Sequence, residues 1–163
     1  MPTLNYMDTD YVSTSVPMRI WQLAGLCSDS VKAVTIVNWM VMGVYFTREL
    51  LFAMKKVESP KCLGCLENVG ENLTHFLLHC SFYKDVRENY LPKFIENNKK
   101  ISEIIGNENM MMLSVLDPLH SKLPENVSKG WQSSKKAYEN SRNFCFNMHK
   151  KRDKLYKQLE KES

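Results

Sequence analysis

Residues 62–80 read CLGCLENVGENLTHFLLHC, and this stretch decides how the chain is expected to fold. Its cysteines and one histidine follow the spacing C-x2-C-x9-H-x4-C. Zn²⁺ favours sulfur and nitrogen ligands, and a structural site holds it with four of them in a tetrahedron. The spacing therefore predicts a zinc knuckle over residues 60–82. The predicted ligands of its single zinc ion are Cys62, Cys65, His75 and Cys80.

The backbone around these ligands can also be predicted. Gly64, between the two cysteines, is expected where a tight knuckle needs unusual backbone angles. Glu71 or Asn72 can begin a helix that carries His75 into the metal site. His75 and Cys80 are five residues apart, and we expect them on nearly the same side of that helix.

Three other interpretations of the motif remain open. A Cys-x2-Cys pair can be a redox pair, although such pairs accompany a βαβ pattern, and no strand pattern flanks this one. The cysteines can also be small apolar residues of a buried core. His79, next to Cys80, can replace His75 as a ligand, although two consecutive residues would then have to converge on one ion.

The residues of the motif resemble a known family. The segments CLGC at 62–65 and ENLTHFLLHC at 71–80, followed by Tyr83, Asp85 and Arg87, are similar to the zinc-binding region downstream of the reverse transcriptase in non-LTR (LINE-type) retrotransposons. In that family a cysteine pair is followed by an acidic residue, a Leu-x-His helix, a cysteine and then an arginine. The nine-residue loop of this chain is long for the family, and the polymerase itself is not part of this sequence.

The resemblance is good over residues 31–91, fair over 110–160 and poor over 1–29. It implies a zinc module that helps the polymerase of the element to hold its RNA or its target DNA, with a reverse transcriptase core as a further partner. We expect no enzymatic activity, because the sequence has no Gly-rich phosphate loop, no Ser-His-Asp set and no nuclease-like carboxylate cluster. Asp8 and Asp10 lack the flanking apolar strands of a polymerase palm, which holds two Mg²⁺ ions with paired aspartates.

The C-terminal segment is basic. Residues 133–163 contain nine Lys or Arg and four Asp or Glu, a net charge of +5, whereas the whole chain carries +4. Apolar residues recur there at helical steps, so we predict one long helix with a basic face. Clustered Lys and Arg residues are typical of surfaces that bind nucleic-acid phosphates. The predicted phosphate contacts are Lys150, Lys151 and Arg152, with Lys154 and Lys157 secondary.

Two classes of function follow from these features. The first is a zinc module that binds RNA or DNA with little sequence specificity, through phosphate contacts. The alternative is a structural zinc domain that docks on a polymerase or another protein and has no nucleic-acid binding of its own. The net charge of +4 is modest for a nucleic-acid binder, and the basic helix can equally be a solvated face or the seam of a partner helix.

The predicted fold is all-α: a small helical domain with an embedded CCHC zinc knuckle and a long basic C-terminal helix. We expect a disordered N-terminus over residues 1–15, a helical zinc-binding domain over 16–132 and the basic helix over 133–163. Valines recur at helical spacing from Val31 onwards, although the β-branched run 31–37 also fits a strand.

We expect an intracellular protein, nuclear or cytoplasmic. Five cysteines without a signal-peptide pattern indicate a reducing compartment, in which Cys27 and Cys145 are free thiols. Residues 31–46 are strongly apolar but include Lys32 and Asn38. They are also fewer than the roughly 20 apolar residues of a membrane-spanning helix, so we predict a buried helix and no membrane.

Overall fold

The structure is a computed structural model, and it describes residues 28–95, 107–118 and 135–163. Every regular element in these ranges is a helix or a helical turn. In chain order they are α2 (Ser28–Val41), α3 (Arg48–Ala53), the π-helical turn η2 (His75–His79), the 3-10 turn η3 (Ser81–Tyr83), α4 (Lys84–Ile95), α6 (Glu108–Leu116) and α8 (Lys135–Glu162). The all-α prediction is confirmed for this part of the chain, whereas the predicted disordered residues 1–15 and the boundary at 132–133 lie outside it.

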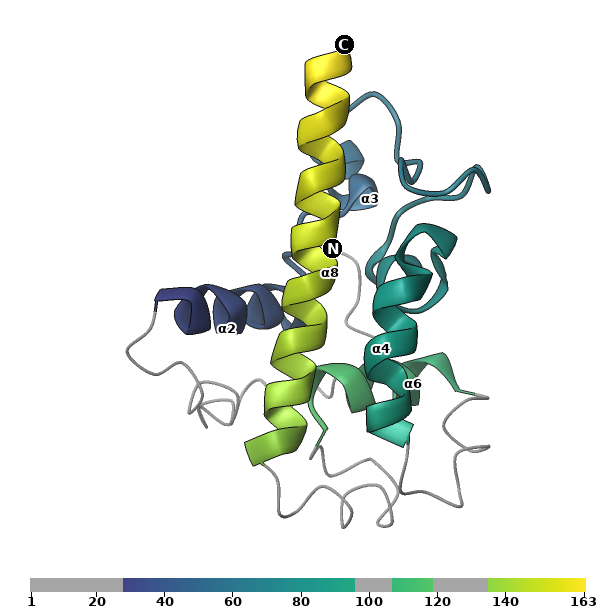
Figure 1. Cartoon of the computed structure of the whole chain (residues 1–163). Helices are drawn as coiled ribbons and strands as arrows, with labels where there is room; N and C mark the ends of the chain where they lie inside the picture. Colours follow the sequence, from purple (N-terminus) through teal and green to yellow (C-terminus); the bar gives the residue numbers. More distant parts are fainter. Residues whose placement is uncertain (1–27, 96–106, 119–134) are drawn as a thin grey trace.

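Helix α8 is the axis on which α2 and α4 pack. It is 28 residues long, with α2 crossing it on one side and α4 lying beside it on the other (Figure 1). Its N-terminal half is attached to α6 and the residues that follow α6. The hydroxyl of Tyr138 donates to Asp117 Oδ1 over 2.6 Å, and the hydroxyl of Ser141 donates to the carbonyl of Val115.

The valine-rich segment forms helix α2, so the strand alternative for 31–37 is wrong. Val34 and Val37 are both fully buried at helical spacing, because one face of the helix packs against α8 and α6. Beyond the end of α2, Gly43 has a φ of 68°, a left-handed conformation that glycine adopts at little cost. None of the described helices has the length and apolar character needed to cross a membrane.

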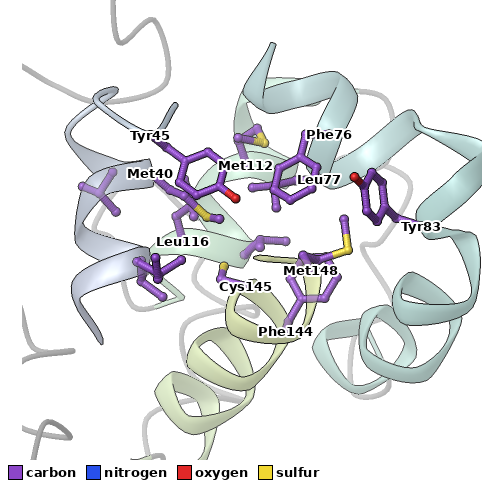
Figure 2. Close-up of a cluster of buried hydrophobic side chains, with 14 of the residues drawn as sticks. Met40, Tyr45, Phe76, Leu77, Tyr83, Met112, Leu116, Phe144, Cys145 and Met148 are labelled. Atoms are coloured by element: carbon purple, nitrogen blue, oxygen red, sulfur yellow. The ribbon is translucent and has the colours of Figure 1, made fainter. Parts of the chain in front are cut away.

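The hydrophobic core surrounds the residues that follow His75 in the chain. The ring of Tyr45 stacks on that of Phe76 with centroids 5.6 Å apart, and Tyr83 meets Phe76 edge-on at 4.9 Å. Phe76 and Leu77 are completely buried, so the turn that begins at His75 is held in the core by its own next two residues. Figure 2 shows these side chains with the other large core residues Met40, Met112, Leu116, Phe144, Cys145 and Met148.

Candidate metal centre

The four predicted ligands lie together in the structure. Their ligand atoms are all within 4.8 Å of one another, and all four side chains are buried. The Sγ atoms of Cys62 and Cys80 are 3.7 Å apart, and Cys65 Sγ lies 3.4 Å from His75 Nε2. A tetrahedral zinc ion has Zn–S and Zn–N distances of about 2.3 and 2.0–2.1 Å, which place two sulfurs about 3.8 Å apart and a sulfur and a nitrogen about 3.6 Å apart. The donor set and its spacing therefore fit a tetrahedral ion such as Zn²⁺.

A short antiparallel bridge positions the cysteine pair. Lys61 and Gly70 form this bridge, and the backbone N–H of Cys62 donates to the carbonyl of Val69 over 2.8 Å. The chain reverses through Asn68, whose φ of 58° is left-handed, a conformation that asparagine tolerates better than most residues. The segment that carries the cysteine pair, residues 61–70, is therefore closed on itself by backbone contacts.

Gly64 has a different role from the predicted one. Its φ is not in the left-handed region, so unusual backbone angles do not explain the glycine. A Cβ at this position would lie 3.1 Å from three atoms of the Phe82 side chain. The glycine instead lets the cysteine pair approach the aromatic residue that follows the last ligand.

The histidine and the last cysteine are brought together by a π turn. Asn72 caps this turn, because its Oδ1 accepts a hydrogen bond from the backbone N–H of His75 over 2.8 Å. In a regular α-helix, residues five positions apart point about 140° away from each other, so the predicted same-side arrangement does not hold for an α-helix. The π turn brings the two ligands back to the same side through an i→i+5 hydrogen bond, in which the N–H of Cys80 donates to the carbonyl of His75 over 2.7 Å.

His79 lies outside the cluster, so the alternative ligand set is not the one that the structure forms. Its Nε2 lies 2.5 Å from Glu108 Oε1 at the start of α6, and both side chains are more than half exposed. The pair links the π turn to α6 on the surface. His75, in contrast, is buried with its Nε2 beside Cys65.

Arg87 would balance the net charge of a zinc-loaded ligand set. Three thiolates, a neutral imidazole and a Zn²⁺ ion would together carry one negative charge. The buried Arg87 donates from Nη2 to the carbonyl of Cys80, which places its guanidinium beside this charge. Arg87 belongs to the motif that resembles the retrotransposon region, but its contact with the ligand backbone was not predicted from the sequence.

The thiols have strongly altered proton affinities because they are buried beside one another. A hydrogen bond from Cys80 lowers the pKa of the Cys62 thiol well below its ordinary value, and the same contact raises the pKa of Cys80. Burial raises the pKa of the Cys65 thiol. A metal ion must displace the remaining protons, so binding is expected to weaken in acid.

Glu71 lies between the two ligand pairs and is fully buried. Its Oε1 accepts from Arg152 Nε at 3.1 Å, from Arg152 Nη2 at 2.5 Å and from the backbone N–H of Arg48 at 3.0 Å. Its Oε2 accepts from the hydroxyl of Tyr156 at 3.0 Å. The sequence offered Glu71 only as a helix start and as the acidic residue of the family pattern, and no local signal indicated that it contacts α8.

The predicted phosphate contacts divide into two groups in the structure. Arg152 is buried against Glu71 and also donates to the carbonyl of Phe46, so it does not belong to the exposed basic surface of α8. Lys151 is 28% exposed and pairs with Asp85 at 2.5 Å. The remaining three are exposed, at positions i, i+4 and i+7 of α8: Lys150, Lys154 and Lys157. We call these three residues the lysine face.

Comparison of the chain with protein families, with characterised proteins and with solved structures found no match. The metal centre therefore rests on its own geometry, and the retrotransposon origin stays a prediction from the motif.

Proposed function

We propose that this chain is a structural zinc module that binds the phosphate backbone of RNA or DNA through the lysine face of α8. The observation that carries the proposal is the buried cluster of four ligand atoms within 4.8 Å of one another. Three cysteines and one histidine complete a tetrahedron and leave no position for water or substrate, which is typical of structural rather than catalytic zinc. The resemblance of the motif to the zinc-binding region of non-LTR retrotransposon reverse transcriptases supports an origin in such a polyprotein.

The lysine face supports the nucleic-acid part of the proposal. Lys150, Lys154 and Lys157 lie on one exposed side of α8, and Lys161 continues the row one turn further on. The nearest acidic partner on the same helix is Asp153, whose carboxylate lies 2.7 Å from Lys157 Nζ. Side chains one helical turn apart can contact successive phosphates of one strand, and such contacts do not read bases.

The test is a titration of the zinc-loaded protein with single-stranded RNA, single-stranded DNA and duplex DNA at two salt concentrations. Replacing Lys150, Lys154 and Lys157 by Glu should weaken binding to all sequences alike. The slope of log affinity against log salt should become about 2 units flatter on single strands, since each lost phosphate contact contributes about 0.7.

A matched control changes the same total charge elsewhere. Lys32, Lys56 and Lys84 are exposed lysines on α2, after α3 and at the start of α4, and their replacement by Glu should affect binding much less. Equal losses in the two triple variants would indicate a general charge effect, and unchanged binding in the first would exclude the lysine face as the interface.

A docking function is the second candidate, because apolar side chains gather on the exposed surface near the end of α2 and in α3. Trp39 is 39% exposed and meets Phe46, 50% exposed, with ring centroids 6.4 Å apart. Met42, Val44 and Phe52 are also more than 40% exposed. Apolar groups on a surface are typical of protein-binding sites. A chain that binds zinc but no nucleic acid at low salt would favour this function.

A further inference from the structure

The knuckle has almost no apolar core of its own. Between residues 60 and 72 the buried side chains are those of Cys62, Cys65 and Glu71, whereas Leu66 is fully exposed and Leu63 is 40% exposed. Apolar burial therefore cannot order this segment, and a metal ion joining its two ends would supply most of the ordering free energy. The conformation of Glu71 consequently depends on the metal-bound knuckle.

Backbone contacts tie Glu71 to the knuckle through its N–H and to helix α3 through its carbonyl. Its N–H donates to the carbonyl of Pro60 over 2.9 Å, and its carbonyl accepts from the N–H of Glu49 over 3.1 Å. Gly70, just before it, closes the bridge to Lys61, and Asn72, just after it, caps the turn of the ligand His75. Any loosening of the ligand pairs would therefore move the backbone that carries the Glu71 carboxylate.

The other end of this contact is the C-terminal half of α8. After Met148, the only buried residue of α8 is Arg152, which is paired with Glu71. Tyr156, one turn later, donates its hydroxyl to the same carboxylate. The N-terminal half is held independently, by Phe144 in the core and by the hydrogen bonds of Tyr138 and Ser141 to the region of α6.

From these contacts we infer that Glu71 couples the metal centre to the C-terminal half of α8. With metal bound, the knuckle presents a buried carboxylate that docks Arg152 and Tyr156, and loss of the metal releases the helix beyond Met148. Because Lys150, Lys154 and Lys157 lie in the released half, metal occupancy would control where the lysine face is held. The inference rests on the proposed function, because it requires that the centre binds a metal ion. It adds that metal occupancy regulates the lysine face.

Hydrogen exchange of the full chain tests the coupling without any nucleic acid. Zinc is first measured in the purified protein, and then exchange is compared with and without a chelator. Zinc removal should speed exchange of amides 149–157 and of the knuckle on the order of tenfold or more, while amides 138–146 change little. Protection of 149–157 that does not depend on zinc would overturn the coupling, whereas a chain without zinc would overturn the proposed function instead.

Two variants locate the coupling at the carboxylate. Glu71→Gln should keep about one zinc per chain and still speed exchange of amides 149–157, because it removes the charge that pairs with Arg152. If Glu71→Gln folds poorly, Tyr156→Phe serves as the second variant. It removes a single hydroxyl and should also speed exchange of amides 149–157, by a smaller factor. The matched control is Asp85→Asn, which removes the exposed carboxylate paired with Lys151 and should leave exchange unchanged. Faster exchange in 138–146 to the same extent as in 149–157 would show general destabilisation and contradict the inference.

Discussion

Replacement of Glu71 by alanine should be among the most destabilising substitutions in this chain. The Glu71 side chain is 1% exposed and that of Arg152 is 10% exposed, so the energetics of a buried rather than a surface ion pair apply. Removing one partner of a buried pair leaves an uncompensated charge, which costs about 3–5 kcal/mol. Urea unfolding of the zinc-saturated protein, followed by circular dichroism, would measure this loss in the free energy of unfolding.

A double substitution distinguishes this reasoning from a simple loss of packing. In Glu71→Leu/Arg152→Met both charges are gone. The backbone N–H of Arg48 and the hydroxyl of Tyr156 lose their partner in this variant and in Glu71→Ala alike, and the carbonyl of Phe46 loses its partner in the double variant, at a cost of about 1–3 kcal/mol per group. Because only Glu71→Ala leaves an uncompensated charge, the double variant should be the more stable of the two, by about 2 kcal/mol. If the two single losses simply add in the double variant, Arg152 does not depend on Glu71 and the reasoning is refuted.

Three further predictions concern the metal, acid stability and the cysteine pair. Metal analysis should find about one zinc per chain in the parent and in Cys145→Ala, since Cys145 lies in the core, and none in Cys80→Ser, where one of four ligands is lost. Burial lowers the pKa of His149 below its ordinary value of 6.5. As the pH drops below 6.5, the unfolded chain therefore binds a proton on this histidine before the folded chain does, and the free energy of unfolding falls. His149→Gln should make this fall shallower in unfolding curves measured at several pH values. Gly64→Ala should cost about 1 kcal/mol by pressing its Cβ on Phe82 while zinc content stays the same, and an unchanged urea midpoint would contradict the close approach seen here.

Features that depend on neighbours in the sequence were predicted well. The ligands Cys62, Cys65, His75 and Cys80 lie within 19 positions, so their spacing alone indicated that they converge. The helical repeat of the valines likewise identified part of the buried face of α2, because a helix places residues three and four apart on one side: Val34 and Val37 are buried, whereas Val31 is exposed.

Features that depend on tertiary contacts were not predicted. Glu71 and Arg152 are 81 positions apart, and nothing near either residue indicates that they meet. A run of basic residues reads as a solvated or phosphate-binding surface, so Arg152 was grouped with the lysines beside it. The π turn at His75 was also missed, because it differs from an α-helix by one hydrogen-bond step and leaves no distinct pattern in the sequence.

Because of the π turn, the loop between Cys65 and His75 should tolerate changes in length better than the segment between His75 and Cys80. An insertion near Leu66, at the exposed tip of the knuckle, lengthens a loop in water and costs only a little closure entropy. An insertion between His75 and Cys80 would instead place the two ligands six positions apart, which is about 120° around an ordinary helix, and so would separate them. Natural variants of this chain should therefore differ in the length of the first loop but gain no residue between the histidine and the last cysteine.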